Sequence, residues 1–359
     1  MKYIEIIKEL ERKLSSLPQE SDPLYSKNII RLEVSGNANS LNELSKLADK
    51  IGNFDLISNG KEVENKNKRI KVYGPEDNIE YRFLTEDRNI YIAKAKVNTG
   101  KIMLISSSKM EQLRLKLLLN GYNQIIILAE EGSKIAIEEF FEGEEAGIIN
   151  EINAKEGSDI KIDIINEANK SLSFYTGAAG NNSRIEINSF FVGEAKSNNK
   201  IICSQNSSAH INNIIVAQSK NVDITDYIIN ASQNAKAFIS ARAIGKNATI
   251  FIKENSIIEK GANGSEANII AKGINMGGSK IETIPAMTTN ENDVKAAHSA
   301  DVAPLSNTFI EYLMSRGISP KDSRKLLLKG FVYENMNAFQ SKDLLESIID
   351  NHLGKILGD

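Results

Sequence analysis

Histidine and cysteine, the side chains best suited to binding metals, are scarce in this sequence, which has three histidines and one cysteine in 359 residues. His298 lies among small residues in the segment NDVKAAHSADVAPL, residues 292–305. Alternation along a strand puts it on the face that carries the neighbouring alanines and valines. Two interpretations follow: a neutral imidazole in a dry site, which suits iron or another borderline metal, or a core histidine hydrogen-bonded to a neighbour.

The other metal-binding and nucleophilic residues are predicted to be inert. Cys203 sits in the short apolar segment KIICSQ, where a free cysteine is typically a small buried hydrophobe. His210 and His352 stand in polar surroundings and are predicted to be solvated. One cysteine excludes a disulfide framework and a four-cysteine metal site within a single chain. If His298 is a ligand, the thiolates therefore have to come from another subunit.

Motifs of common enzyme classes are missing. The sequence has no Walker A loop, no G-x-G-x-x-G, no H-E-x-x-H and no G-x-S-x-G. A carbohydrate-active enzyme built on stacked strands would need acids clustered beside an arginine or lysine on neighbouring coils. The acids here are scattered along the chain. That class therefore stands only as an alternative, and we expect a protein that is not an enzyme.

Charge and hydropathy exclude two kinds of partner. There are 44 basic and 47 acidic residues, and this balance does not favour nucleic acid or an anionic membrane surface. No run of 18 apolar residues is present, so no membrane span is predicted. The first residues alternate charged and apolar types instead of forming the apolar core of a signal peptide. A cytoplasmic protein is expected.

The elements that would position His298 are short strands. From residue 125 onward, apolar segments of three to six residues follow one another, each introduced by a polar turn such as EEGS, KEGS or NNSR. The early turns recur at intervals of about 25 residues and most later ones at about half that spacing, which is typical of a coil made of two or more strands. No amphipathic helices separate them, so a doubly wound sheet is excluded. The fold class predicted for residues 125–303 is mainly β, a parallel β-helix.

An N-terminal region of mixed α and β character is expected over residues 1–124. Its apolar spacing predicts amphipathic helices at 4–17 and 40–51, and short strands appear between residues 73 and 105. The segment KMEQLRLKLLLNGY, residues 109–122, is predicted to form a further helix that ends at Gly121.

A C-terminal helical domain is expected over residues 304–359. Its first helix covers 308–316, and its second starts at Ser319-Pro320, with serine as N-cap and proline at the first position, and stops at Gly330. A third covers 341–357. Apolar residues exceed what one narrow face needs, so a second surface is expected to be buried, against either the β-helix or another protein.

NDVKAAHSADVAPL followed by FIEYLMSRGISPKDSRKLLLKGF resembles the C-terminal signature of the SufB/SufD family of iron–sulfur cluster assembly proteins. The resemblance implies a right-handed parallel β-helix in a complex with SufB, SufD and two copies of the ABC-type ATPase SufC. In that complex the two β-helices meet edge to edge, the C-terminal helices dock the ATPase, and the ATPase activity belongs to SufC.

Two departures separate this sequence from SufB. In SufB a glutamate follows the histidine and a cysteine lies upstream in the same sheet, whereas here Ser299 follows His298 and AKGINMGGSKIETI has no cysteine. The sequence is most similar to SufD. The resemblance then implies that His298 is a ligand, at the SufB interface, of a transient iron–sulfur cluster shared with SufB, with none bound by this chain alone. A homodimeric scaffold without SufB is the alternative.

The same resemblance implies a contact surface for SufC on the first two C-terminal helices. The residues assigned to it are Phe309, Tyr312, Leu313, Arg316, Gly317, Leu326, Leu327, Gly330 and Phe331.

Overall fold

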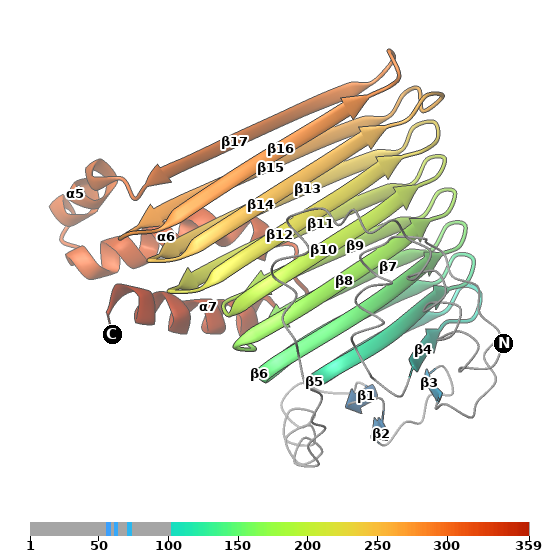
Figure 1. The fold of residues 1–359 in the computed structure, drawn as a ribbon, viewed down its shortest axis with the longest axis horizontal. Coiled ribbons are helices and arrows are strands. Elements are labelled where there is room, and N and C mark those ends of the chain that lie inside the picture. The colour runs from blue at the N-terminus through green and yellow to red at the C-terminus, as the bar shows by residue number, and fades with distance from the viewer. Residues whose placement is uncertain (1–54, 59–60, 64–69, 74–101, 359) are drawn as a thin grey trace, which may run out of the picture.

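Parallel strands stacked in register build most of the described chain, which comprises residues 55–58, 61–63, 70–73 and 102–358 of a computed structural model (Figure 1). Four short strands come first: β1 (Asp55–Ser58), β2 (Lys61–Val63), β3 (Ile70–Tyr73) and β4 (Ile102–Ser106). The chain then winds into a parallel β-solenoid of about seven turns, which confirms the predicted fold class. Its strands are β5 (Gln112–Ala129), β6 (Lys134–Ala154), β7 (Asp159–Asn166), β8 (Lys170–Ala179), β9 (Arg184–Phe191), β10 (Glu194–Cys203), β11 (Ser208–Gln218), β12 (Asn221–Asn230), β13 (Lys236–Lys246), β14 (Thr249–Ile258), β15 (Glu266–Met276), β16 (Lys280–Thr289) and β17 (Lys295–Pro304).

Each full turn contributes one strand to each of two parallel sheets. The odd sheet runs β7, β9, β11, β13, β15, β17, and the even sheet runs β8, β10, β12, β14, β16. The long strand β6 pairs with β7 through its first half and with β8 through its second half, so it belongs to both sheets. Side chains that point inward from the two sheets fill the interior between them.

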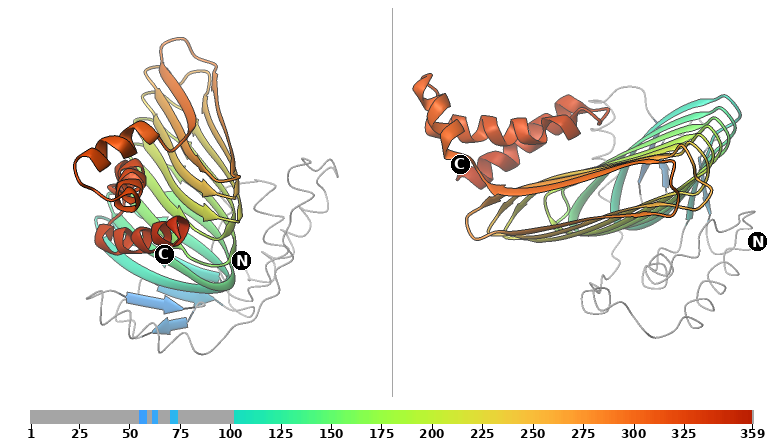
Figure 2. Two further views of the ribbon diagram at one scale, coloured as in Figure 1. Left: turned by 90° about the vertical axis from the view of Figure 1, so that its left-hand side faces the viewer. Right: turned by 90° about the horizontal axis from the view of Figure 1, so that it is seen from above.

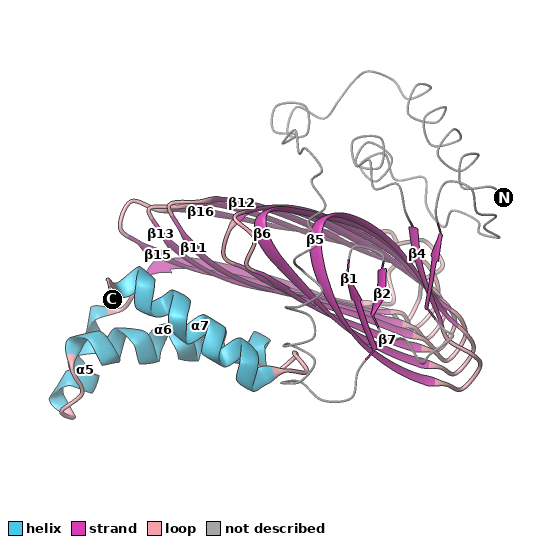
Figure 3. Cartoon of the chain, turned by 90° about the horizontal axis from the view of Figure 1, so that it is seen from below, coloured by secondary structure: helices cyan, strands magenta, loops and turns pink. Residues whose placement is uncertain are grey.

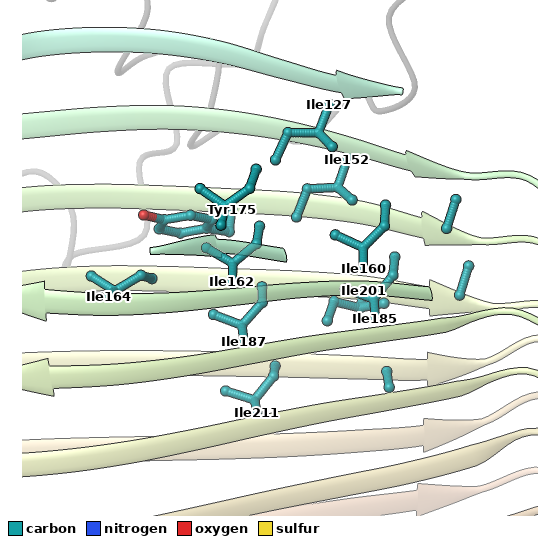
Figure 4. Close-up of a cluster of buried hydrophobic side chains, with 14 of the residues drawn as sticks. Ile127, Ile152, Ile160, Ile162, Ile164, Tyr175, Ile185, Ile187, Ile201 and Ile211 are labelled. Atoms are coloured by element: carbon teal, nitrogen blue, oxygen red, sulfur yellow. The ribbon is translucent and has the colours of Figure 1, made fainter. Parts of the chain in front are cut away.

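Because the strands stack in register, the same position in successive coils carries a similar side chain. In the odd sheet the inward position is occupied in turn by Leu115, Ile137, Ile162, Ile187, Ile211, Ile239 and Ile269, and each of them is buried. Figure 4 shows three members, Ile162, Ile187 and Ile211, above one another. β-Branched residues suit a pleated, buried surface. We call this set the isoleucine column.

One predicted helix is wrong. Residues 109–122 were expected to be helical because leucine favours helices, but residues 112–129 form strand β5. Leu113, Leu115, Leu117 and Leu119 are buried, at every second position, and pairing with β6 stabilises the strand. The boundary expected at residue 124/125 falls inside this strand. The helices expected at 4–17 and 40–51 lie outside the described residues.

Three helices follow the solenoid: α5 (Asn307–Ser315), α6 (Pro320–Met336) and α7 (Lys342–Leu357). The predicted N-cap of α6 is present, since the Ser319 side chain accepts a hydrogen bond from the Asp322 amide. The predicted end at Gly330 is wrong, because α6 continues to Met336. A glycine inside a helix costs only about 1 kcal/mol relative to alanine, and burial of Val332 and Met336 beyond it offsets that cost.

Helices α6 and α7 pack on the outer face of the odd sheet (Figure 3). Leu328, Val332 and Met336 of α6 join one apolar cluster with Phe190 and Ile244 of the sheet. The helical domain therefore buries one of its surfaces against the solenoid. Part of the predicted excess of apolar residues in the helices is therefore buried against the solenoid.

The connection between α6 and α7 is fastened to the first coils by hydrogen bonds. The Gln340 amide donates to Asp163 Oδ2 at 2.6 Å, and Asn188 Nδ2 donates to the Ala338 carbonyl at 3.2 Å. Lys116 Nζ lies 3.1 Å from Ser341 Oγ. These contacts tie the end of the chain to the beginning of the solenoid.

One turn of every coil needs a left-handed backbone. Asn182, Asn206 and Asn234 occupy it in successive coils with φ between 54° and 57°. Each amide bonds to the next, with Asn206 Nδ2 at 3.2 Å from Asn182 Oδ1 and Asn234 Nδ2 at 3.1 Å from Asn206 Oδ1. Gly264 takes this position in the following coil, and a Cβ there would lie 2.3 Å from Asn234 Oδ1.

We predict that Gly264→Ala lowers the free energy of unfolding by about 2 kcal/mol, through the left-handed φ and the contact with Asn234. Gly261→Ala is the matched control, since Gly261 also has a positive φ but no atom lies within 4 Å of its added Cβ. Thermal unfolding of both variants checks this. Equal losses of unfolding free energy in the two variants would show that the contact with Asn234 does not contribute.

Candidate functional site

His298 continues the isoleucine column. The register of β15 and β17 places it directly beside Ile269, so its side chain belongs to the inward-facing set, as alternation predicted. It is nevertheless exposed, because β17 is the last strand of its sheet and no further coil of the described residues covers it. The interpretation of His298 as a core histidine is therefore wrong for this chain alone.

The last coil leaves the end of the solenoid open (Figure 2). Nearly every residue of β17 is exposed, whereas β13, two coils below, is buried along most of its length. Among the described strands, the backbone of β17 pairs with β15 and that of β16 with β14, each on one side only. Both therefore present unpaired backbone groups, which accept further strands readily. Pro285 interrupts this edge in the middle of β16, and β17 has no proline before its last residue, Pro304.

The described residues contain no group of three or more histidine, cysteine or acidic side chains that could hold a metal. Cys203 is fully buried in the interior at the end of β10, which confirms its predicted character. Burial raises the pKa of its thiol to about 12, so it remains protonated at neutral pH and is a poor ligand. His298 has no thiolate partner among the described residues.

The other two histidines are less solvated than predicted. The His210 ring packs against Phe238 with centroids 5.7 Å apart, and desolvation lowers its pKa. His352 Nε2 lies 2.8 Å from Glu167 Oε1, which links α7 to the solenoid. Both residues are half-buried and structural.

Acids that look scattered in the sequence meet inside the solenoid. In the even sheet, Asp226 of β12 stands beside Glu254 of β14, and both point inward with no exposed surface. Glu139 lies deeper in the stack, hydrogen-bonded by Tyr175 and Asn150. Burial raises the pKa of Glu139 to about 8 and that of Asp226 to about 7, and it holds the pKa of Glu254 well above its ordinary value. These acids are sealed from a polysaccharide, so they give no support to the carbohydrate-active alternative.

Five large apolar side chains of α5 and α6 are exposed: Phe309, Tyr312, Met314, Leu326 and Tyr333. We call this set the α5–α6 surface. Arg316 borders it, with its guanidinium 5.4 Å from the centre of the Tyr312 ring.

Most of the residues assigned to a partner contact lie on or next to this surface. Arg316, Gly317 and Gly330 are exposed, and Leu313 and Leu327 are half-buried. Phe331 is turned partly toward the solenoid cluster instead. Sequence reasoning missed Met314 and Tyr333, although Tyr333 follows Leu326 by seven residues, a spacing that puts both on one helix face.

The family follows from residues 118–331, which cover the solenoid and most of α6. They match the family described as SUF system FeS cluster assembly, SufBD core domain. The chain belongs to this family. Shorter similarity links it to iron–sulfur cluster assembly SufBD family proteins of Mycobacterium tuberculosis and Mycobacterium leprae, each 32% identical over 76 residues. That segment is 21% of this chain and 9% of those relatives, so the match spans less than a tenth of their length.

Among the described residues of this SufBD family chain, no helix is both long and apolar enough to cross a membrane.

The buried acids predict an unusual dependence of stability on pH. Because the folded-state pKa of Asp226 is raised, the unfolded chain loses its proton first as pH rises. The stability contributed by the protonated group is complete below about pH 4 and is lost as pH rises through about 7, on the order of 4 kcal/mol. The melting temperature in EDTA should therefore fall between about pH 4 and pH 7, and Asp226 should contribute no further change above about pH 8.

Asp226→Asn should flatten this fall, because the amide stays neutral. The control is Glu282→Gln on the exposed side of β16. A wild-type profile that rises over this range, or one unchanged by Asp226→Asn, would contradict the assignment.

Proposed function

We propose that this chain is a SufD-like, non-catalytic scaffold subunit for iron–sulfur cluster assembly. It pairs with a SufB-like scaffold through its open end and docks a SufC-like ABC-type ATPase through the α5–α6 surface. The observation that carries the proposal is the end of the isoleucine column in His298, on an uncovered coil. Membership in the SufBD family supplies the reaction class.

Pairing is supported by the chemistry of the open end. A second solenoid would satisfy the free backbone groups of β17 and cover the inward side chains that no described coil covers. Because Pro285 interrupts the edge of β16, β17 is the strand that we expect to bond to the partner. Exposed Ile284, 37% accessible, adds apolar area beside it.

The cluster is cargo that both scaffolds hold. This chain offers one imidazole at the open end, and its only thiol is buried three coils away. Iron–sulfur clusters are held mainly by thiolates, with histidine as a replacement on some irons. The remaining ligands therefore belong to the SufB-like partner, and the site is complete only in the pair.

Hydrogen bonds and an ion pair hold α6 on the solenoid, so a movement of α6 by the ATPase would be transmitted to the strands that it contacts. Asn335 of α6 is buried and donates to the carbonyls of Asn213 and Ser240 at 3.1 and 3.2 Å. Arg242 Nη2 lies 2.7 Å from Glu334 Oε2 on the same helix. A partner that moves α6 as it binds ATP therefore moves the coils of β11 and β13 with it. The ligand then drives whichever arrangement of the scaffolds it binds better.

Replacing the histidine tests the ligand role. In the reconstituted complex, His298→Ala should leave the subunit stoichiometry unchanged and abolish most iron and sulfide loading, because one ligand of the shared cluster is gone. Ser299→Ala, on the opposite strand face, is the control. Unchanged loading in His298→Ala would refute the ligand role, and a native mass without a SufB-like subunit would favour the homodimer.

Point variants test docking without disturbing the solenoid cluster. Phe309→Ala and Leu326→Ala remove side chains that are 62% and 52% exposed. Each should weaken binding of the ATPase about tenfold or more, as loss of an apolar anchor does. Met110→Ala, an exposed apolar residue near the start of β5, is the matched control. Calorimetric titration with the ATPase measures all three, and equal affinities would contradict the proposed surface.

A further inference from the structure

The interior of the solenoid contains a column of polar side chains across from its apolar ones. In the even sheet, Asn199, Asp226 and Glu254 occupy one inward position on β10, β12 and β14. All three are completely buried. Neighbouring strands lie about 4.8 Å apart, so the two carboxyl groups share one small, dry volume.

Asp226 has its hydrogen bonds within this volume. Asn199 Nδ2 donates to its Oδ1 at 2.7 Å, and Asn213 Nδ2, from the opposite sheet, donates to its Oδ2 at 2.6 Å. In the next coil the residue that stacks on Asn213 is Ala241. Glu254 therefore faces a methyl group where Asp226 faces an amide. Neither oxygen of Glu254 has a hydrogen-bond partner among the described residues.

Unpaired oxygens from both sheets line this part of the interior. Besides the two of Glu254, the amide oxygens of Asn199 and Asn213 lack donors in the described part of the chain. The two amide oxygens are acceptors only, and each buried polar atom without a partner costs about 1–3 kcal/mol. The positive charge of Arg242 does not satisfy these oxygens, because its guanidinium lies on the outer face and forms an ion pair with Glu334 there.

In the same interior, Glu139 has a hydrogen-bond partner for each of its two oxygens, and we call this the closed arrangement. Its two oxygens accept from Tyr175 Oη and Asn150 Nδ2, and neither is left unpaired. Glu254 differs from Glu139 in that both of its own carboxyl oxygens lack a partner among the described residues. A ligand that several oxygen atoms can bind at once would satisfy these unpaired groups.

We propose that Asp226 and Glu254, with the amide oxygens of Asn199 and Asn213, form a binding site for a hard divalent cation such as Mg²⁺ or Mn²⁺. Oxygen-only ligand sets select such cations over zinc or copper, and two carboxylates balance the double charge. The cation joins β10, β12 and β14 to the odd sheet from within. This site is independent of the proposed scaffold function.

Manganese binding to the full-length chain tests the site. After EDTA treatment and dialysis, added Mn²⁺ should raise the melting temperature saturably by several degrees, with one tightly bound Mn²⁺ per chain by electron paramagnetic resonance. Glu254→Gln should lose both effects. Glu139→Gln, equally buried but in the closed arrangement, should keep them.

A second variant guards against misfolding of Glu254→Gln. Glu254→Leu removes both unpaired oxygens at similar volume, so it folds without a cation and should not bind Mn²⁺. Wild-type protein that is not stabilised by millimolar Mn²⁺ or Mg²⁺ would overturn the proposal. Retention of the bound Mn²⁺ in Glu254→Leu would also overturn it, since it would place the ion on the surface.

Discussion

A coil of two strands cannot bury its own inward face and does so only against the same face of the next coil. Everything else in the described structure depends on this constraint. It selects the isoleucine column, because an inward position must suit the residue above and the residue below at once. It also requires that the last coil stay uncovered unless another molecule covers it. His298 is exposed for this reason and not because its own strand turns it outward.

The same stacking concentrates polar groups. An inward asparagine or acid acquires neighbours from the coils above and below as well as from across the interior, so the balance of donors and acceptors is set over three coils. Glu139 is balanced by residues of two other strand segments, whereas Ala241 leaves Glu254 without an equivalent of Asn213. Among the described residues, Glu254 lacks a hydrogen-bond donor because Ala241 stands where the preceding coil has Asn213.

The periodicity of turns predicted the solenoid, and alternation predicted the inward position of His298, because both depend only on local spacing. Strand β5 was mistaken for a helix because its leucines favour helices in isolation, while its alternation is satisfied only by β6. Gly330 looked like a helix end because the sheet that stabilises α6 beyond it is far away in sequence. Exposure of His298 and convergence of the acids depend on which coil lies next, which spacing along one strand does not encode.

The hydrogen bonds between the α6–α7 connection and the first coils also determine the order of events during synthesis. Each coil contacts mainly its neighbours and can pack as it leaves the ribosome. Gln340, however, bonds to Asp163, which was made 177 residues earlier. Until α6 and α7 emerge, Phe140, Ile165 and Phe190 on the outer face of the early coils stay in contact with water. The nascent chain therefore exposes most apolar surface just before α6 and α7 emerge, and a ribosome that stalls before these helices are made endangers the first coils as much as the last.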